Sequence, residues 1–143
     1  MIRAAVVREK IEIEKLTREA ASPASGAVAI FLGTVRSQNE GRDVTGIEYS
    51  AYDEMAEREM MNILDEAAAK FSIHSGIVEH RVGELEVGDA SIGIVVTHAH
   101  RGAALDALRY VIDETKARAP VWKLEHYVDG SREWVGAGTG KPQ

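Results

Sequence analysis

Hydrophobic residues along the chain follow two periodicities, one typical of strands and one typical of helices. Apolar runs predict about seven strands, at residues 2–9, 26–36, 44–52, 75–85, 90–100, 121–127 and 131–135. The run from Gly26 to Arg36 is almost unbroken and rich in valine and isoleucine, which favours a strand buried on both faces. The polar, glycine-containing segment 37–43 predicts a mobile loop.

Apolar residues spaced by three and four predict two main helices. The clearest covers residues 53–71, with an apolar stripe formed by Ala56, Met60, Ile63, Leu64, Ala67 and Phe71. The second runs from Gly102 to about Arg118, with the stripe Leu105, Leu108, Val111 and Ile112. Pro120 disfavours helix at the residue before it, so this helix ends there. A shorter helix is expected at residues 14–22, and Asp129-Gly130 predicts a hairpin turn.

The order of these elements indicates the fold class. Strands joined by hairpins outnumber the helices, and few crossovers are available, so the pattern favours an α+β fold over a doubly wound sheet. The 143 residues suit one domain, which we place at residues 1–136. The glycine-containing tail at 137–143 is expected to be flexible.

Composition narrows the chemistry. The chain has no cysteine, so disulfides, thiolate metal sites and cysteine nucleophiles are excluded, and any sulfur chemistry requires an external donor. A net charge of -6 argues against binding to nucleic acid or to acidic membranes. No long apolar run predicts a membrane span, and the charged N-terminus lacks the core of a signal peptide, so we expect a cytoplasmic protein. We expect neither a metal nor a cofactor.

Two basic clusters stand out against this acidic background. His100 and Arg101 precede a helix N-terminus, which suits an anion such as phosphate, although a surface turn explains them equally well. The pair His98 and His100 has metal-like spacing but no evident third ligand. Arg36 follows a strand, where it either marks the point at which the strand reaches solvent or contacts a ligand.

The stretch "KARAPVWKLE" carries the second cluster. Lys116 and Arg118 lie in the last turn of a helix, where cations complement the helix dipole without any function. Strand alternation places Lys123 and Glu125 on one face, outward or toward a cleft, and Trp122 on a face that resembles core. The turn at Pro120 folds the strand back beside the helix end. Lys123 then either approaches Lys116, lowering the pKa of both amines, or pairs with Glu125 in solvent.

Five motifs can be distinguished in order along the chain: "FLGTVRSQNEG", "YSAYDEMAEREM", "VEHRVGELEVGD", "THAHRGAALDAL" and "KARAPVWKLE". Together they resemble the large catalytic subunit of molybdopterin synthase. The resemblance implies an α/β hammerhead fold with a mixed, mainly antiparallel sheet. It implies sulfur transfer to cyclic pyranopterin monophosphate (precursor Z), giving molybdopterin for molybdenum cofactor biosynthesis. It further implies that the sulfur donor is the C-terminal Gly-Gly thiocarboxylate of a small ubiquitin-like subunit. The assembly implied is a homodimer within a heterotetramer.

The same resemblance implies site residues. Lys116 and Lys123 match the two active-site lysines, and His100 and Arg101 match a pair that reaches the pterin site across a dimer interface. The full substrate-binding set is Phe31, Thr34, Val35, Arg36, His100, Arg101, Lys116, Lys123, Leu124 and Glu125. Leu124 departs from a basic residue found in some members. The resemblance leaves the separate roles of the lysines, and any role for Arg118, open.

Two other functions stay open on the sequence. A non-catalytic module that binds a phosphorylated metabolite would share the basic cluster without needing a lysine pair. A purely interacting protein would receive a partner's C-terminal tail in a groove.

Overall fold

The computed structural model describes residues 1–136, in three helices and nine strands. The elements are β1 (Ile2–Val7), α1 (Ile13–Ala20), β2 (Ala27–Thr34), β3 (Gln38–Asn39), β4 (Arg42–Ala51), α2 (Asp53–Phe71), β5 (Ser75–Arg81), β6 (Gly83–Glu86), β7 (Ala90–His98), α3 (Arg101–Arg118), β8 (Val121–Tyr127) and β9 (Arg132–Gly136). The predicted tail at 137–143 lies outside the described residues. Within the described residues, no helix is both long and apolar enough to cross a membrane.

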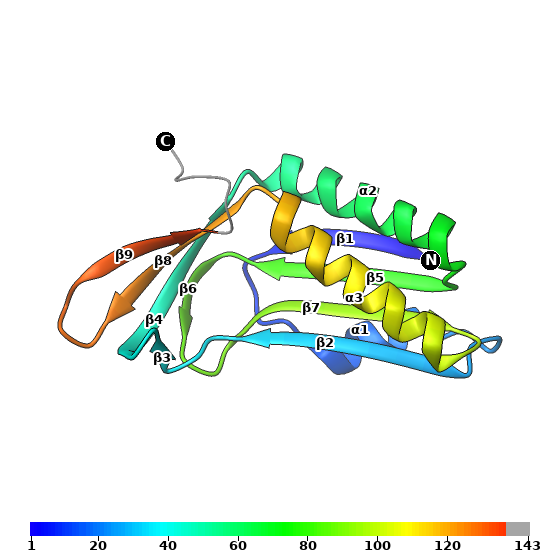
Figure 1. Cartoon of the computed structure of the whole chain (residues 1–143), viewed down its shortest axis with the longest axis horizontal. Helices are drawn as coiled ribbons and strands as arrows, with labels where there is room; N and C mark the ends of the chain where they lie inside the picture. The colour runs from blue at the N-terminus through cyan, green and yellow to red at the C-terminus, as the bar shows by residue number, and fades with distance from the viewer. Residues whose placement is uncertain (137–143) are drawn as a thin grey trace.

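The strands form two sheets joined end to end (Figure 1). The first has the order β1-β5-β7-β2, in which only the β1–β5 pair is parallel. The second has the order β3-β4-β8-β9, with β6 also paired to β4, and its pairs are all antiparallel. The mixed, mainly antiparallel α+β architecture agrees with the prediction.

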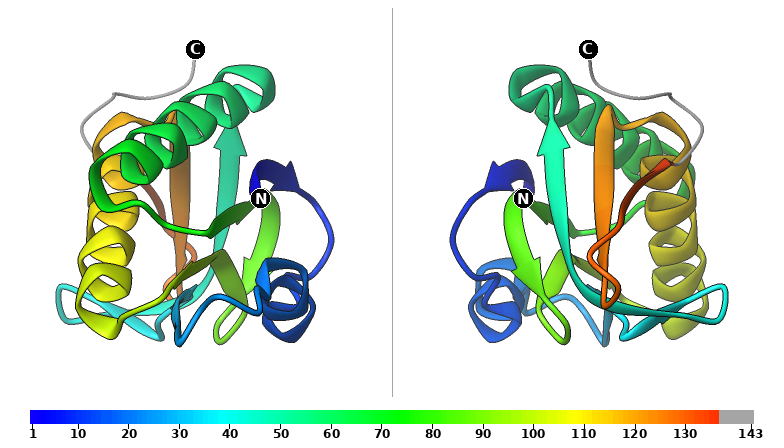
Figure 2. Two further views of the ribbon diagram at one scale, coloured as in Figure 1. Left: turned by 90° about the vertical axis from the view of Figure 1, so that its right-hand side faces the viewer. Right: turned by 90° about the vertical axis from the view of Figure 1, so that its left-hand side faces the viewer.

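Helices cover both faces of the first sheet (Figure 2). On one face, α2 and α3 enclose the main core, where Met60, Ile63, Leu64 and Val111 are fully buried. On the other face, α1 packs against β7 and β5 through Leu16. Burying each such large apolar side chain stabilises the fold by about 1.5–3 kcal/mol. The arrangement leaves the C-terminal end of α3 beside the junction of the two sheets.

The prediction that residues 26–36 are buried on both faces is wrong in the single chain. Residues facing α3 pack into the core, but Val28, Ile30 and Leu32 on the other face are 47%, 46% and 40% exposed. The physical reason is position: β2 is the edge strand, and α1 lies over β7 and β5. An apolar run shows that both faces of a strand lack charged side chains. It does not show whether other parts of the same chain bury both faces.

Two further predictions need correction around turns. Segment 37–43 is not an irregular loop: β3 pairs with the start of β4 across a turn in which Glu40 and Gly41 have φ of 50° and 77°. Positive φ at both central residues suits the twist of a tight hairpin. The expected strand at 75–85 divides at Val82, where Gly83 (φ 102°) turns the chain from the first sheet into the second. These changes raise the strand count above seven.

The stripe of α3 also differs from the predicted one. Its buried side is made by Ala104, Ala107, Val111 and Thr115, whereas Leu105 is 56% exposed. Small residues let the helix approach the sheet closely, so the larger leucine and isoleucine side chains lie at the margin of the contact.

Arg118 joins α3 to α2. Its guanidinium contacts Glu66 at 2.7 Å, Glu59 at 2.7 Å and Glu114 at 3.2 Å. Hydrogen bonds from Arg118 are the largest cause that lowers the pKa of Glu66, from 4.5 to about 2. The predicted cation at the helix end therefore has a structural role in tying the two main helices together.

Arg118→Ala is expected to lower the melting temperature by a few degrees. The folded-state pKa of Glu66 is depressed, so the stabilisation is complete above pH 4.5 and is lost as pH falls toward 2. Thermal melts of wild type and variant at pH 7 and pH 3 test this. The gap in melting temperature should narrow at the lower pH, and an equal gap at both would contradict the role given to this ion pair.

Candidate active site

A cleft of about 430 Å³ opens where the two sheets meet the C-terminal end of α3. Many of the predicted site residues line it, namely Phe31, Thr34, Val35, Arg36, Lys116, Lys123 and Glu125. A smaller cavity of about 50 Å³ adjoins it and shares Tyr49, Lys116 and Lys123. The tertiary structure thus brings together the end of β2, the end of α3 and the middle of β8.

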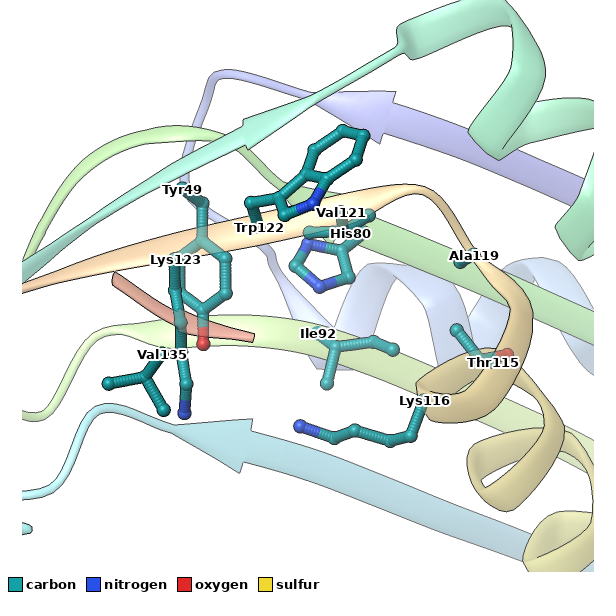
Figure 3. Close-up of a pocket in the computed structure, with 10 residues that line it drawn as sticks. All are labelled: Tyr49, His80, Ile92, Thr115, Lys116, Ala119, Val121, Trp122, Lys123 and Val135. Carbon is teal, nitrogen blue, oxygen red and sulfur yellow. The ribbon is translucent and has the colours of Figure 1, made fainter. Parts of the chain in front are cut away.

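Lys116 and Lys123 reach this space from two different elements. Lys116 lies in the last turn of α3, and Lys123 is the third residue of β8, after the break at Ala119 and Pro120. Their side chains extend toward one another across the cavity (Figure 3). This arrangement agrees with the first of the two alternatives that the sequence left open, in which the turn at Pro120 brings Lys123 near Lys116.

The environment changes the acid–base chemistry of Lys116. Much of its side chain is exposed, but the amine end enters the cavity, and desolvation there lowers the pKa of Lys116. The positive charge of Lys123 lowers the same pKa further. A larger fraction of Lys116 is therefore the neutral amine near pH 7 than for a lysine in water.

Lys123 has both neighbours that the sequence left as alternatives. Its Nζ lies 3.7 Å from Glu125 Oε1, and its charge also acts on Lys116. Glu125 faces the cleft but is buried, with only 3% of its surface exposed. The expectation for the opposite face of β8 holds for Trp122, which is buried, while Leu124 and His126 are only half-buried. Leu124 is not among the described residues that line the cleft or the small cavity.

The end of β2 supplies the remaining predicted group. A register shift interrupts the pairing with β7 between Gly33 and Thr34, and after Thr34 the chain turns toward the second sheet. Val35 buries its side chain against residues of the second sheet and also lines the cleft. Arg36 is exposed and adds a third cation at the cleft mouth.

His100 and Arg101 do not join this cleft within one chain. They line a separate hollow with Gly26, Ala99 and Gly102 at the N-terminal end of α3. Fifteen residues of helix separate Arg101 from Lys116, or about 22 Å at 1.5 Å per residue. The helix start has no side-chain cap and no acidic residue in its first turn, which keeps its backbone N–H groups available to an anion.

The possible metal pair at His98 and His100 has another explanation. His98 Nδ1 accepts a hydrogen bond from the His100 backbone N–H at 2.9 Å, and the His98 ring stacks on His74. No group of three potential metal ligands occurs among residues 1–136. The histidines therefore shape the start of α3.

Tyr49 and His80 line the small cavity, but sequence reasoning missed both (Figure 3). Burial raises the pKa of the Tyr49 phenol and lowers that of His80 to about 4, so both are neutral at pH 7. His80 Nδ1 is 3.0 Å from the Arg81 carbonyl, an acceptor, so Nδ1 carries the proton. In sequence, both residues lie in segments that look like ordinary strands. Only the tertiary structure brings Tyr49 of β4 and His80 of β5 into edge-to-face contact.

Comparison with known proteins decides the family. The family model described as MoaE protein matches residues 6–118, which is most of the chain. The chain belongs to the MoaE family. The resemblance inferred from the five sequence motifs is therefore confirmed.

Members of the MoaE family resemble this chain in both sequence and structure. The molybdopterin synthase catalytic subunit of Pyrococcus abyssi is 43% identical over 127 residues, covering 89% of this chain and 85% of that protein. A crystal structure of molybdopterin synthase from Staphylococcus aureus has a TM-score of 0.88 at 33% identity, covering 92% of this chain and 96% of that one. A chain from the complex of subunits 1 and 2 of molybdopterin-converting factor from Helicobacter pylori has a TM-score of 0.69 at 20% identity. This last match covers 95% of our chain and 90% of that chain, and shows likeness of fold.

Proposed function

We propose that this chain is the catalytic subunit of a molybdopterin synthase. It converts cyclic pyranopterin monophosphate to molybdopterin with sulfur from the C-terminal thiocarboxylate of a small ubiquitin-like subunit. The observation that carries the proposal is the convergence of Lys116 and Lys123 in one cleft of a MoaE-family chain. A chain without cysteine needs a sulfur donor of this external kind.

The charges of the cleft suit two anionic reactants. Arg36, Lys116 and Lys123 face the cleft, while Glu125 is its single acidic lining residue among those described. A thiocarboxylate and a cyclic phosphate are both anions, and bringing them together requires nearby positive charge. Lys116 is the central catalytic group, which stabilises the thiocarboxylate or transfers a proton. Lys123 assists and holds the anionic substrate.

The assembly is part of the same proposal. The small subunit docks so that its tail enters the cleft. A chain of the same fold is present in the solved complex of subunits 1 and 2 of molybdopterin-converting factor from Helicobacter pylori. A second copy of the chain covers the exposed strip Val28, Ile30 and Leu32 and brings its own His100 and Arg101 to the cleft. We place the protein in the cytoplasm and assign residues 1–136 to one domain.

Reconstitution tests the proposal directly. The chain is mixed with a candidate small subunit ending in a Gly-Gly thiocarboxylate and with cyclic pyranopterin monophosphate. We expect a stable complex and a dithiolene product. Complex formation and substrate binding without any dithiolene would reject the enzyme assignment and favour a binding module.

A further inference from the structure

Glu125 is a buried carboxylate in a cleft whose other charged lining residues are cations. Only 3% of the residue is exposed, and Arg36, Lys116 and Lys123 line the same cleft. A buried carboxylate is stable only when hydrogen bonds or opposite charges replace its lost hydration. The identity and direction of those partners therefore decide where its negative charge points.

The two carboxylate oxygens of Glu125 have different partners. Oε2 accepts one hydrogen bond from Asn39 Nδ2 at 2.8 Å and another from the Tyr127 hydroxyl at 2.8 Å. Oε1 lies 3.7 Å from Lys123 Nζ. Two donors on one oxygen restrict rotation of the carboxylate, so the other oxygen stays directed at the lysine.

One donor comes from a different element than Glu125, and the other comes from the same strand. Asn39 lies in β3, the short first strand of the hairpin that follows β2. Its Oδ1 lies 3.5 Å from Arg36 Nη2. Tyr127 ends β8, and Arg42 stacks on its ring at 3.5 Å. The hydrogen bond to Glu125 is the largest cause that raises the pKa of the Tyr127 phenol, which keeps the hydroxyl protonated as a donor.

We propose that Asn39 and Tyr127 are positioning residues for the lysine pair. They hold the Glu125 carboxylate so that its free oxygen orients the Lys123 ammonium within the cleft. The hairpin that carries Asn39 is thereby tied to the strand that carries Lys123. The catalytic consequence rests on the proposed function, whereas the tie between the hairpin and β8 does not.

Tyr127→Phe is the sharpest test, because it removes one hydroxyl and keeps the ring under Arg42. The matched control is Tyr110→Phe, which also removes a phenol that donates to a glutamate, here Glu66 at 2.6 Å, away from the cleft. Kinetics are measured with the thiocarboxylated small subunit. We expect kcat/KM for the pterin to fall about 10-fold in Tyr127→Phe and to stay within about two-fold in the control. Affinity for the small subunit should not change, and Asn39→Ala should resemble Tyr127→Phe.

The same substitution in a Glu125→Gln background tests whether Tyr127 acts through Glu125. We expect Tyr127→Phe to cause no further loss of kcat/KM there, because the charge that it positions is already gone. A loss as large as in the wild-type background would overturn the inference. So would kcat/KM for Tyr127→Phe equal to that of Tyr110→Phe.

A measurement without turnover separates this inference from the proposed function. Amide hydrogen exchange over residues 37–43 should be faster in Asn39→Ala than in Tyr110→Phe, because the hairpin loses its hydrogen bond to Glu125. Unchanged exchange would overturn the tie between the hairpin and β8. Wild-type protein that makes no dithiolene would reject the proposed function, and the exchange result would still decide whether Asn39 ties the hairpin to β8.

Discussion

Lys116→Ala is expected to lower kcat by about 10²–10⁴-fold, the usual contribution of a positioned acid–base group. The amine extends into the cleft toward Lys123, and its pKa is lowered by desolvation and by the charge of Lys123. Alanine keeps the helix turn, because it is the best helix former, so the fold should survive. The measurement is single-turnover formation of dithiolene with the thiocarboxylated partner.

Lys70→Ala is the matched control for this variant. Lys70 occupies the last turn of α2, as Lys116 does in α3, and is equally placed to interact with a helix dipole. It contacts the rings of Phe71 and Tyr110 and does not line the cleft. The control should keep wild-type turnover, and near-normal turnover of a folded Lys116→Ala protein would remove Lys116 from the mechanism.

The pH dependence of turnover identifies which form of Lys116 acts. A rate that rises through its pKa indicates the neutral amine as a base, and a rate that falls indicates the ammonium as the stabilising charge. Lys123→Ala removes one of the two causes of the lowered pKa, so the break in the profile should move to higher pH. If the pH at which the rate changes is the same in Lys123→Ala as in wild type, that change belongs to the titration of another group.

Chains carrying Arg101→Ala and chains carrying Lys116→Ala are expected to recover activity when they are co-expressed. Each variant alone lacks one part of every active site. In a mixed symmetric dimer, one of the two sites receives an intact Lys116 from one chain and an intact Arg101 from the other. Random pairing of equal amounts makes about a quarter of all sites complete.

The geometry of the single chain is the reason for this expectation. Arg101 and Lys116 lie at opposite ends of α3, about 22 Å apart along the axis, and line different hollows. We therefore propose that Arg101 contributes to catalysis from a neighbouring copy of the chain. The exposed Val28, Ile30 and Leu32 on edge strand β2 supply the apolar surface that such a copy would cover.

Co-expression of Lys116→Ala with Lys123→Ala is the matched control. Both lysines line the same cleft of the same chain, so no mixed dimer contains a complete site. We expect no recovery in that pair. Recovery in neither pair, with mixed dimers present by mass spectrometry, would contradict the contribution of Arg101 across an interface.

The candidate site was predictable from sequence to different degrees. Thr34, Arg36, Lys116, Lys123 and Glu125 line one cleft, as the ordered motifs implied. Arg118 looked like a member of the same cluster, but its three glutamate partners come from α2 and from its own helix. Tyr49 and His80 carried no signal, because a buried aromatic residue on an alternating strand is indistinguishable from ordinary core.

The sequence by itself determined the α+β class, the limits of the main helices and the family. These depend on local periodicity, on the proline at 120 and on ordered motifs, all of which are properties of the sequence itself. Only the tertiary structure decided that β2 leaves an apolar face exposed and that Asn39 and Tyr127 hold Glu125. Asn39 and Glu125 are 86 positions apart, and no local pattern reports a contact that depends on how two sheets pack together.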